Sequence, residues 1–176
     1  MQQSTRHITL SALFMALGIL IPMIFHFAML GPILLPMLWP IAASAFFLPM
    51  PYTLAVAVLT PCLSTLLTGM PPVSPPILHI MCIELAVLST VTRVLYVRAA
   101  GMSPFLIMLV SVTVSRLALI ASAAVLSPFL HLPPGMISLF YFVRSLPGAF
   151  ILIIIIPLVL KRLSGTSVFS LRQKNV

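Results

Sequence analysis

Three charged side chains, Glu84, Arg116 and Arg144, fall inside long apolar segments of this 176-residue chain. A charge in hydrocarbon costs several kcal/mol, so such residues usually face a polar partner or a water-filled cavity. Glu84 is the only acidic residue, whereas nine residues are Lys or Arg. The surplus of buried cations predicts a polar pocket in which at least one arginine meets an acidic group on a solute. The alternative is a structural Glu–Arg contact, with the second arginine capped by backbone carbonyls.

The depth of each charge suggests how the charges pair. Glu84 and Arg144 each lie about seven residues into an apolar segment from the same end of the bundle. At 1.5 Å per residue this places both roughly 10 Å down, whereas Arg116 lies near mid-span, about 15 Å down. Equal depth predicts that Glu84 pairs with Arg144. Arg116 is left with carbonyls, hydroxyls such as Ser115 or Thr113, a share of Glu84, or a bound anion.

Further candidate ligands gather in and beside three predicted loops, at residues 27–32, 69–76 and 127–136. The side chains there that can contact a solute through an imidazole, thioether or phenol group are His26, His79, His131, Met29, Met70 and Tyr141. Polar or interfacial roles are commoner for loop histidines than ligand contact. No tight spacing among them supports a free metal ion, so no metal site is predicted.

The sequence contains no catalytic motif. It has no Asp, and a single Glu cannot form a carboxylate pair. No HExxH, GxSxG or phosphate-binding glycine loop is present. Cys62 and Cys82 lack CxxC spacing, so we interpret them as small apolar thiols rather than as a zinc or redox motif. We expect neither enzymatic activity nor a cofactor.

The composition requires a lipid bilayer as solvent. Hydrophobic residues make up 61% of the chain and charged residues 6%, and the mean hydropathy is +1.26. A soluble domain of this size could not bury so much apolar surface. The net charge of +8 fits an anionic membrane surface rather than nucleic acid, because the basic residues lie at the membrane ends. We therefore predict an all-α integral membrane protein.

Apolar runs punctuated by prolines predict one domain over residues 1–176, a bundle of six transmembrane helices. The expected helices cover residues 8–25, 33–48, 52–68, 77–97, 104–126 and 137–160, before a short basic tail at 161–176. Pro36 and Pro40 leave open whether the second helix is continuous, divided or re-entrant. With both termini on one side, that side carries seven Lys or Arg and the opposite loops carry none. The positive-inside rule then places both termini in the cytoplasm.

Three short motifs resemble the substrate-binding S component of energy-coupling factor (ECF) transporters, a family of small six-helix membrane proteins. Residues 5–16 (TRHITLSALFMA) look like the first helix of the family, with Ala12 and Ala16 as its Ala-x-x-x-Ala contact motif. Residues 31–37 (GPILLPM) look like the following segment, and residues 67–72 (LTGMPP) like the loop after the third helix. Leu38 departs from the pattern, because many relatives carry His directly after the Pro-Met pair.

The resemblance implies capture of a micronutrient at the outer face of a bacterial or archaeal cytoplasmic membrane. It also implies partners: a transmembrane coupling subunit, contacted through Ala12 and Ala16, and two cytosolic ATPases that supply the energy. The surplus arginines favour a vitamin-type solute with an anionic group. A non-transporting bacterial membrane scaffold of the cell-shape protein type is the alternative, and in it the buried charges act as struts.

Within the transport interpretation, the ligand can also be a tetrapyrrole such as haem or a corrinoid. His26, His79 or His131 would then serve as an axial ligand of its metal, while arginines meet its acidic side chains. A free metal ion is not expected as the solute. The N-terminal Met1-Gln2 departs from the metal-chelating Met-His start of the nickel and cobalt members.

Overall fold

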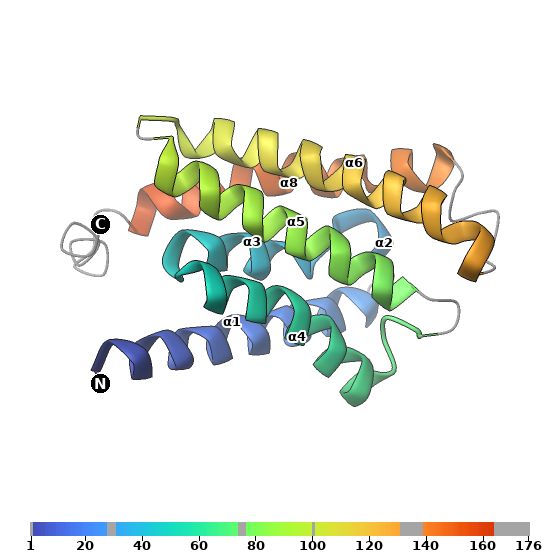
Figure 1. The fold of residues 1–176 in the computed structure, drawn as a ribbon, viewed down its shortest axis with the longest axis horizontal. Coiled ribbons are helices and arrows are strands. Elements are labelled where there is room, and N and C mark those ends of the chain that lie inside the picture. The colour runs from blue at the N-terminus through green and yellow to red at the C-terminus, as the bar shows by residue number, and fades with distance from the viewer. Residues whose placement is uncertain (1, 28–30, 74–76, 100, 131–138, 164–176) are drawn as a thin grey trace.

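The computed structural model describes residues 2–27, 31–73, 77–99, 101–130 and 139–163, and every regular element among them is a helix (Figure 1). In chain order the helices are α1 (Gln2–Phe27), α2 (Gly31–Leu34), α3 (Leu38–Phe47), α4 (Met50–Thr68), α5 (Ile77–Arg98), α6 (Pro104–Leu130) and α8 (Leu139–Leu163). The described residues thus confirm the predicted all-helical class.

Five of the helices, α1, α4, α5, α6 and α8, are long and apolar enough to cross a membrane. Their lengths match the roughly 20 apolar residues that a bilayer crossing requires. These helices indicate a multi-pass membrane protein. The expected second crossing differs, because residues 33–48 do not form one long helix.

The break in this segment lies at residues 35–37. Leu35 adopts a left-handed conformation with φ of 50°, and the N–H of Leu38 donates to the Leu35 carbonyl at 3.0 Å. The indole N–H of Trp39 donates to the carbonyl of Leu34 at 3.0 Å, which ties the two helices together. Pro40 does not interrupt α3, because it lies in the first turn, where the backbone N–H has no partner within the helix. Of the alternatives left open for the second segment, the structure thus shows a helix divided at Pro36.

The short helix α3 forms the centre of the bundle. Its ten residues span about 15 Å, half of a bilayer core. Ile41, Ala42 and Ala45 are completely buried in it. It contacts α1, α4, α5 and α8, which lie around it (Figure 1). Small residues on α3 let these longer helices approach closely.

The neighbouring helix α2 packs against α8 at Gly148. A Cβ atom on Gly148 would lie 2.5 Å from the carbonyl oxygen of Ile33 and 2.7 Å from the carbonyl carbon of Leu34. Both are backbone atoms that cannot rotate away. The absence of a side chain at Gly148 therefore lets the broken segment lie directly on α8.

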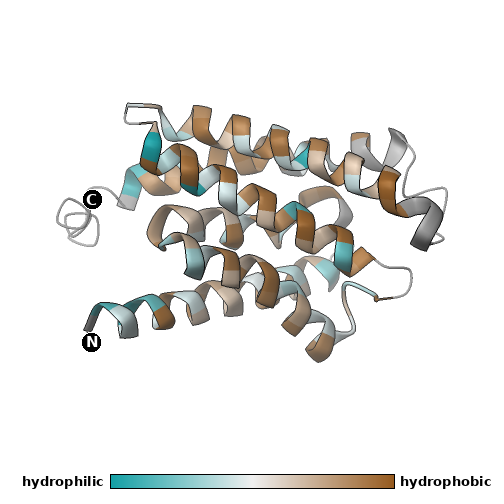
Figure 2. Ribbon diagram, viewed as in Figure 1, coloured by the Kyte–Doolittle hydropathy of each residue, from teal (hydrophilic) through white to brown (hydrophobic). Residues whose placement is uncertain are grey.

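Polar residues mark one end of the bundle. The start of α1, the end of α5 and the end of α8 lie together there, and Figure 2 shows these helix ends as hydrophilic. The first turns of α1 carry Arg6, the last turn of α5 carries Arg98, and the last turn of α8 carries Lys161 and Arg162. The charges of the described helices are thus concentrated at the end of the bundle that contains the start of α1 and the ends of α5 and α8.

Candidate functional site

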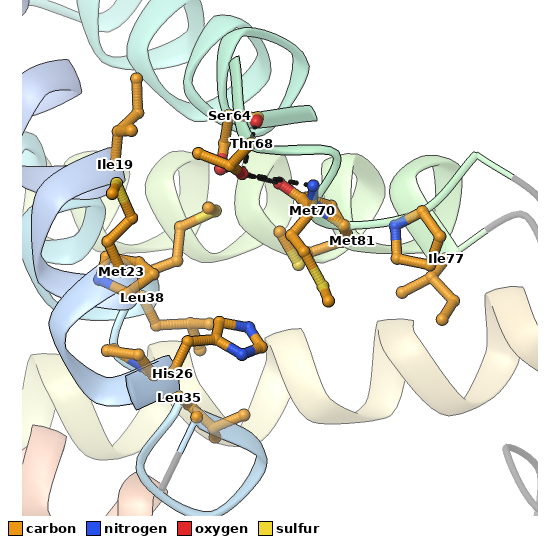
Figure 3. Close-up of a pocket in the computed structure, with 16 residues that line it drawn as sticks. Ile19, Met23, His26, Leu35, Leu38, Ser64, Thr68, Met70, Ile77 and Met81 are labelled. Atoms are coloured by element: carbon orange, nitrogen blue, oxygen red, sulfur yellow. Dashed lines mark hydrogen bonds between the residues drawn. The ribbon is translucent and has the colours of Figure 1, made fainter. Parts of the chain in front are cut away.

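A cavity of about 480 Å³ lies towards the end of the bundle away from the basic helix ends (Figure 3). Its walls come from the last turns of α1, the α2–α3 turn, the end of α4 with the segment that follows it, and the start of α5. The residues that line it are Ile19, Pro22, Met23, His26, Gly31, Leu35, Pro36, Met37, Leu38, Ser64, Thr68, Met70, Pro71, Pro72, Ile77 and Met81.

The break between α2 and α3 helps to make this space. In an uninterrupted helix, the residues after Leu34 would continue along the helix axis, past the end of α1. The turn at residues 35–37 instead places Leu35 and Met37 at the cavity wall. Pro36, between them, is also buried at the lining. The proline that divides the segment thus contributes directly to the shape of the site.

Hydroxyl groups fix the opposite wall. Helix α4 ends at Gly69, whose φ of 73° and N–H bond to the carbonyl of Thr65 (2.9 Å) form a left-handed cap. The chain then turns back over the helix end, where Ser64 donates to the carbonyl of Met70 and Thr65 to that of Pro71, both at 2.7 Å. These bonds place Met70 at the cavity, as Figure 3 shows.

Sulfur and imidazole dominate the chemistry of the lining. Met23, Met37, Met70 and Met81 are four of its residues, although only 11 methionines occur in the whole chain. The ring of His26 lies against Gly31, because a Cβ built there would be 3.7–3.8 Å from three ring atoms. No charged side chain belongs to the lining described above, and flexible thioethers adapt to irregular apolar ligands. The cavity therefore suits a largely apolar molecule with few polar groups.

The buried charges form a separate centre between α5 and α6. Nη2 of Arg116 lies 2.7 Å from Oε1 of Glu84, and their side chains are 14% and 5% exposed. The sequence left several possible partners for Arg116, and in the structure Glu84 is in contact with it. Neither residue lines the cavity. The pair thus lies apart from the cavity, on the α6 side of α5, and the predicted polar pocket around the charges stays a prediction.

The same two helices bury hydroxyl groups without hydrogen-bond partners among the described residues. Ser89 and Thr92 on α5 and Ser111 on α6 are completely buried, and their oxygens have no hydrogen-bond partner among the described residues. Buried polar groups of this kind usually bind internal water. Helices α5 and α6 thus bury polar groups in addition to the Glu84–Arg116 pair.

The remaining sequence candidates separate into three groups. His26 and Met70 line the cavity, whereas His79 is exposed on α5 and lies outside the lining. Met29 and His131 lie outside the described residues. The side chains of Tyr141 and Arg144 on α8 are also outside what the structure describes, so the predicted Glu84–Arg144 contact stays a prediction.

The two alanines of the predicted contact motif lie on the outer face of α1. Ala12 and Ala16 are exposed, whereas Ser11 and Gly18 face the bundle. Gly18 packs so closely on α4 that a Cβ would lie 2.5 Å from the methyl group of Thr60. Helix α1 therefore presents small residues outward while it is held to α4 on its inner side.

Sequence reasoning missed most of the cavity. Met23, Met37 and Met81 were not singled out, although Ile77 and Met81 have the i, i+4 spacing of one helix face. These side chains come from different helices, whose rotation about their axes one sequence does not fix.

Comparison of the chain with family models, with curated proteins and with solved structures found no match.

Proposed function

We propose that the protein captures a small organic micronutrient in the cavity and delivers it through a partner complex, in the manner of an ECF S component. The cavity carries this proposal. Its volume of about 480 Å³ lies within the roughly 300–1,000 Å³ of ligand sites, and its apolar lining with few polar groups is typical of them.

Charge distribution supports an outward-facing cavity. The basic residues of α1, α5 and α8 lie at one end of the bundle, and cytoplasmic ends of membrane helices are enriched in Lys and Arg. This orientation places both termini in the cytoplasm and the cavity near the outer face of a bacterial or archaeal cytoplasmic membrane. A solute arriving from outside would then meet the cavity first.

The lining favours an apolar, ring-containing solute. Thioethers make favourable contacts with aromatic rings, and His26 offers the one imidazole of the described lining. A metal-bearing tetrapyrrole fits this donor set, with His26 as its axial ligand. Because Arg116 is paired with Glu84, an anionic group on the solute would have to meet a side chain outside the described lining.

Helix α1 is the proposed contact for the coupling subunit. Ala12 and Ala16 are exposed on it, and small residues four positions apart let a partner helix approach closely. ATP hydrolysis would then take place on two cytosolic partner subunits. The lipid bilayer covers the other outward faces, where large apolar side chains such as Leu20 and Ile24 are exposed.

Native mass spectrometry of the detergent-purified protein, with its visible absorption spectrum, tests this function. We expect a bound small molecule of defined mass, and a Soret band if the solute is a porphyrin. The proposal would be contradicted if the protein purifies without a bound small molecule and then binds no vitamin or tetrapyrrole on titration.

A membrane scaffold of the cell-shape protein type is the competing function, and it accounts for the Glu84–Arg116 pair as a strut that takes no part in binding a solute. Under the scaffold function, purification from native membranes would recover cell-shape partners and no solute. Under the transport function, it would recover the coupling subunit and the ATPases.

A further inference from the structure

Each of the four walls of the cavity contributes one methionine. Figure 3 shows Met23 on the α1 side of the space, with Met70 from the segment after α4 and Met81 from α5 across from it. The fourth, Met37, comes from the turn at residues 35–37. A molecule that fills the cavity therefore meets thioethers from several directions.

A thioether distinguishes an aromatic ring from a saturated one. Sulfur makes favourable contacts with aromatic rings, often at the ring edge, whereas a saturated ring offers it only ordinary van der Waals contact. A methionine side chain also has three rotatable bonds, so it can adjust to the position of a bound ring. Four such side chains around one space thus favour a flat aromatic molecule.

The backbone of Met70 is fixed, while its side chain has room to adjust. The carbonyl of Met70 accepts a hydrogen bond from the hydroxyl of Ser64 at 2.7 Å, and its N–H donates to Oγ1 of Thr68 at 3.2 Å. The residue is nevertheless 48% exposed, so neighbouring side chains do not enclose the thioether. The end of α4 therefore holds this sulfur-bearing side chain at the cavity without fixing its rotamer.

The hydroxyl groups of the same wall are already engaged with the backbone. Ser64 donates to the carbonyl of Met70, and Thr68 donates to the carbonyl of Ser64 at 2.8 Å. Neither hydroxyl proton is then available to a solute without breaking one of these bonds. Sulfur contact is therefore the interaction that this wall offers most readily.

We propose that Met23, Met37, Met70 and Met81 determine the specificity of the cavity, which selects a planar aromatic solute over a saturated one with the same ring skeleton. The inference rests on the proposed function, because it takes the cavity as the capture site and names the class of solute. The two claims can fail separately. A protein that retains a native molecule without aromatic selection keeps only the capture function, whereas one that purifies empty can still show the selection towards added probes.

The test compares 2-naphthol with decahydro-2-naphthol, which has the same ring skeleton and hydroxyl group but no aromatic ring. Isothermal titration calorimetry of the full chain in lipid nanodiscs, corrected with empty nanodiscs, measures the Kd of each probe. We expect the wild type to bind 2-naphthol more tightly. Met23→Leu and Met81→Leu, which keep volume and apolarity, should each weaken 2-naphthol about 2–10-fold and change decahydro-2-naphthol less than about twofold.

Met15→Leu is the matched control. Met15 lies on α1, as Met23 does, but packs against the core and is not part of the lining. Its substitution should leave the affinity for both probes unchanged. The proposal is overturned if neither probe binds or if the wild type binds both equally. It is also overturned if Met23→Leu and Met81→Leu weaken both probes alike, or if Met15→Leu weakens 2-naphthol as much as they do.

Discussion

Replacing Glu84 by Gln should destabilise the protein strongly, because the change leaves the guanidinium of Arg116 buried without its counter-charge. The two groups are 2.7 Å apart and largely buried, so solvent screens the contact little. Removing one partner of a buried pair costs about 3–5 kcal/mol in free energy of unfolding. The amide keeps the shape of the carboxylate, so the loss reports on charge rather than on packing.

The reverse substitution should be milder. In Arg116→Met, the carboxyl of Glu84 can become neutral by taking up a proton, whereas the guanidinium in Glu84→Gln stays charged. In the double variant no charge remains at this position, and we expect a stability near that of the wild type. The two single losses should therefore be strongly non-additive, with a coupling at least as large as the loss from Glu84→Gln alone, about 3–5 kcal/mol.

Reversible unfolding in mixed detergent micelles with SDS measures these differences, followed by circular dichroism. Arg98→Gln is the matched control, because Arg98 is an exposed arginine at the end of α5. It should change the free energy of unfolding by less than about 0.5 kcal/mol. The reasoning is refuted if Glu84→Gln loses less than about 1 kcal/mol, or if the double variant loses the sum of the single losses.

Three further substitutions test the fold and the partner surface. Gly148→Ala should lower the unfolding free energy by about 1–3 kcal/mol in the same SDS assay, because its Cβ would lie 2.5 Å from the carbonyl oxygen of Ile33; an unchanged value would contradict the close contact. Ser64→Ala should lose about 1 kcal/mol with the 2.7 Å bond to Met70, and equal stability of variant and wild type would count against a role of that bond. Ala12→Trp should leave unfolding unchanged and abolish co-purification with the proposed coupling subunit, since Ala12 is exposed on α1; normal co-purification would exclude Ala12 from the proposed interface.

Length and composition predicted the helical class and the membrane environment from the sequence, because long apolar runs have few other solutions. The division of the second segment was left open. Pro36 and Pro40 are both unfavourable in the interior of a helix. Which of the two interrupts the helix depends on their positions relative to the turn at residues 35–37. Pro40 lies in the first turn of α3, where a missing N–H matters little. Such a choice depends on where α2 packs against α8.

The candidate site was predicted less well than the helices. The depth of a residue along a helix can be read from the sequence, and equal depth suggested a contact between Glu84 and Arg144. The rotation of a helix about its axis cannot be read from the sequence. Arg116 differs from Glu84 in predicted depth by about 5 Å, a difference that a long side chain can span, and the two are in contact. The cavity likewise gathers His26 and Met70 with residues of other helices whose facing directions no single sequence specifies.

The most direct test of the account compares two variants of neighbouring residues on α1. Ile19 lines the cavity, whereas Leu20 is 55% exposed on the outer side of the helix. Both are aliphatic, and substitution by Trp adds a similar volume at each. Native mass spectrometry of the purified proteins then measures the fraction that retains a small molecule. The account predicts that Ile19→Trp loses the bound molecule and Leu20→Trp retains it at the wild-type level. Equal retention by both variants would contradict capture in this cavity.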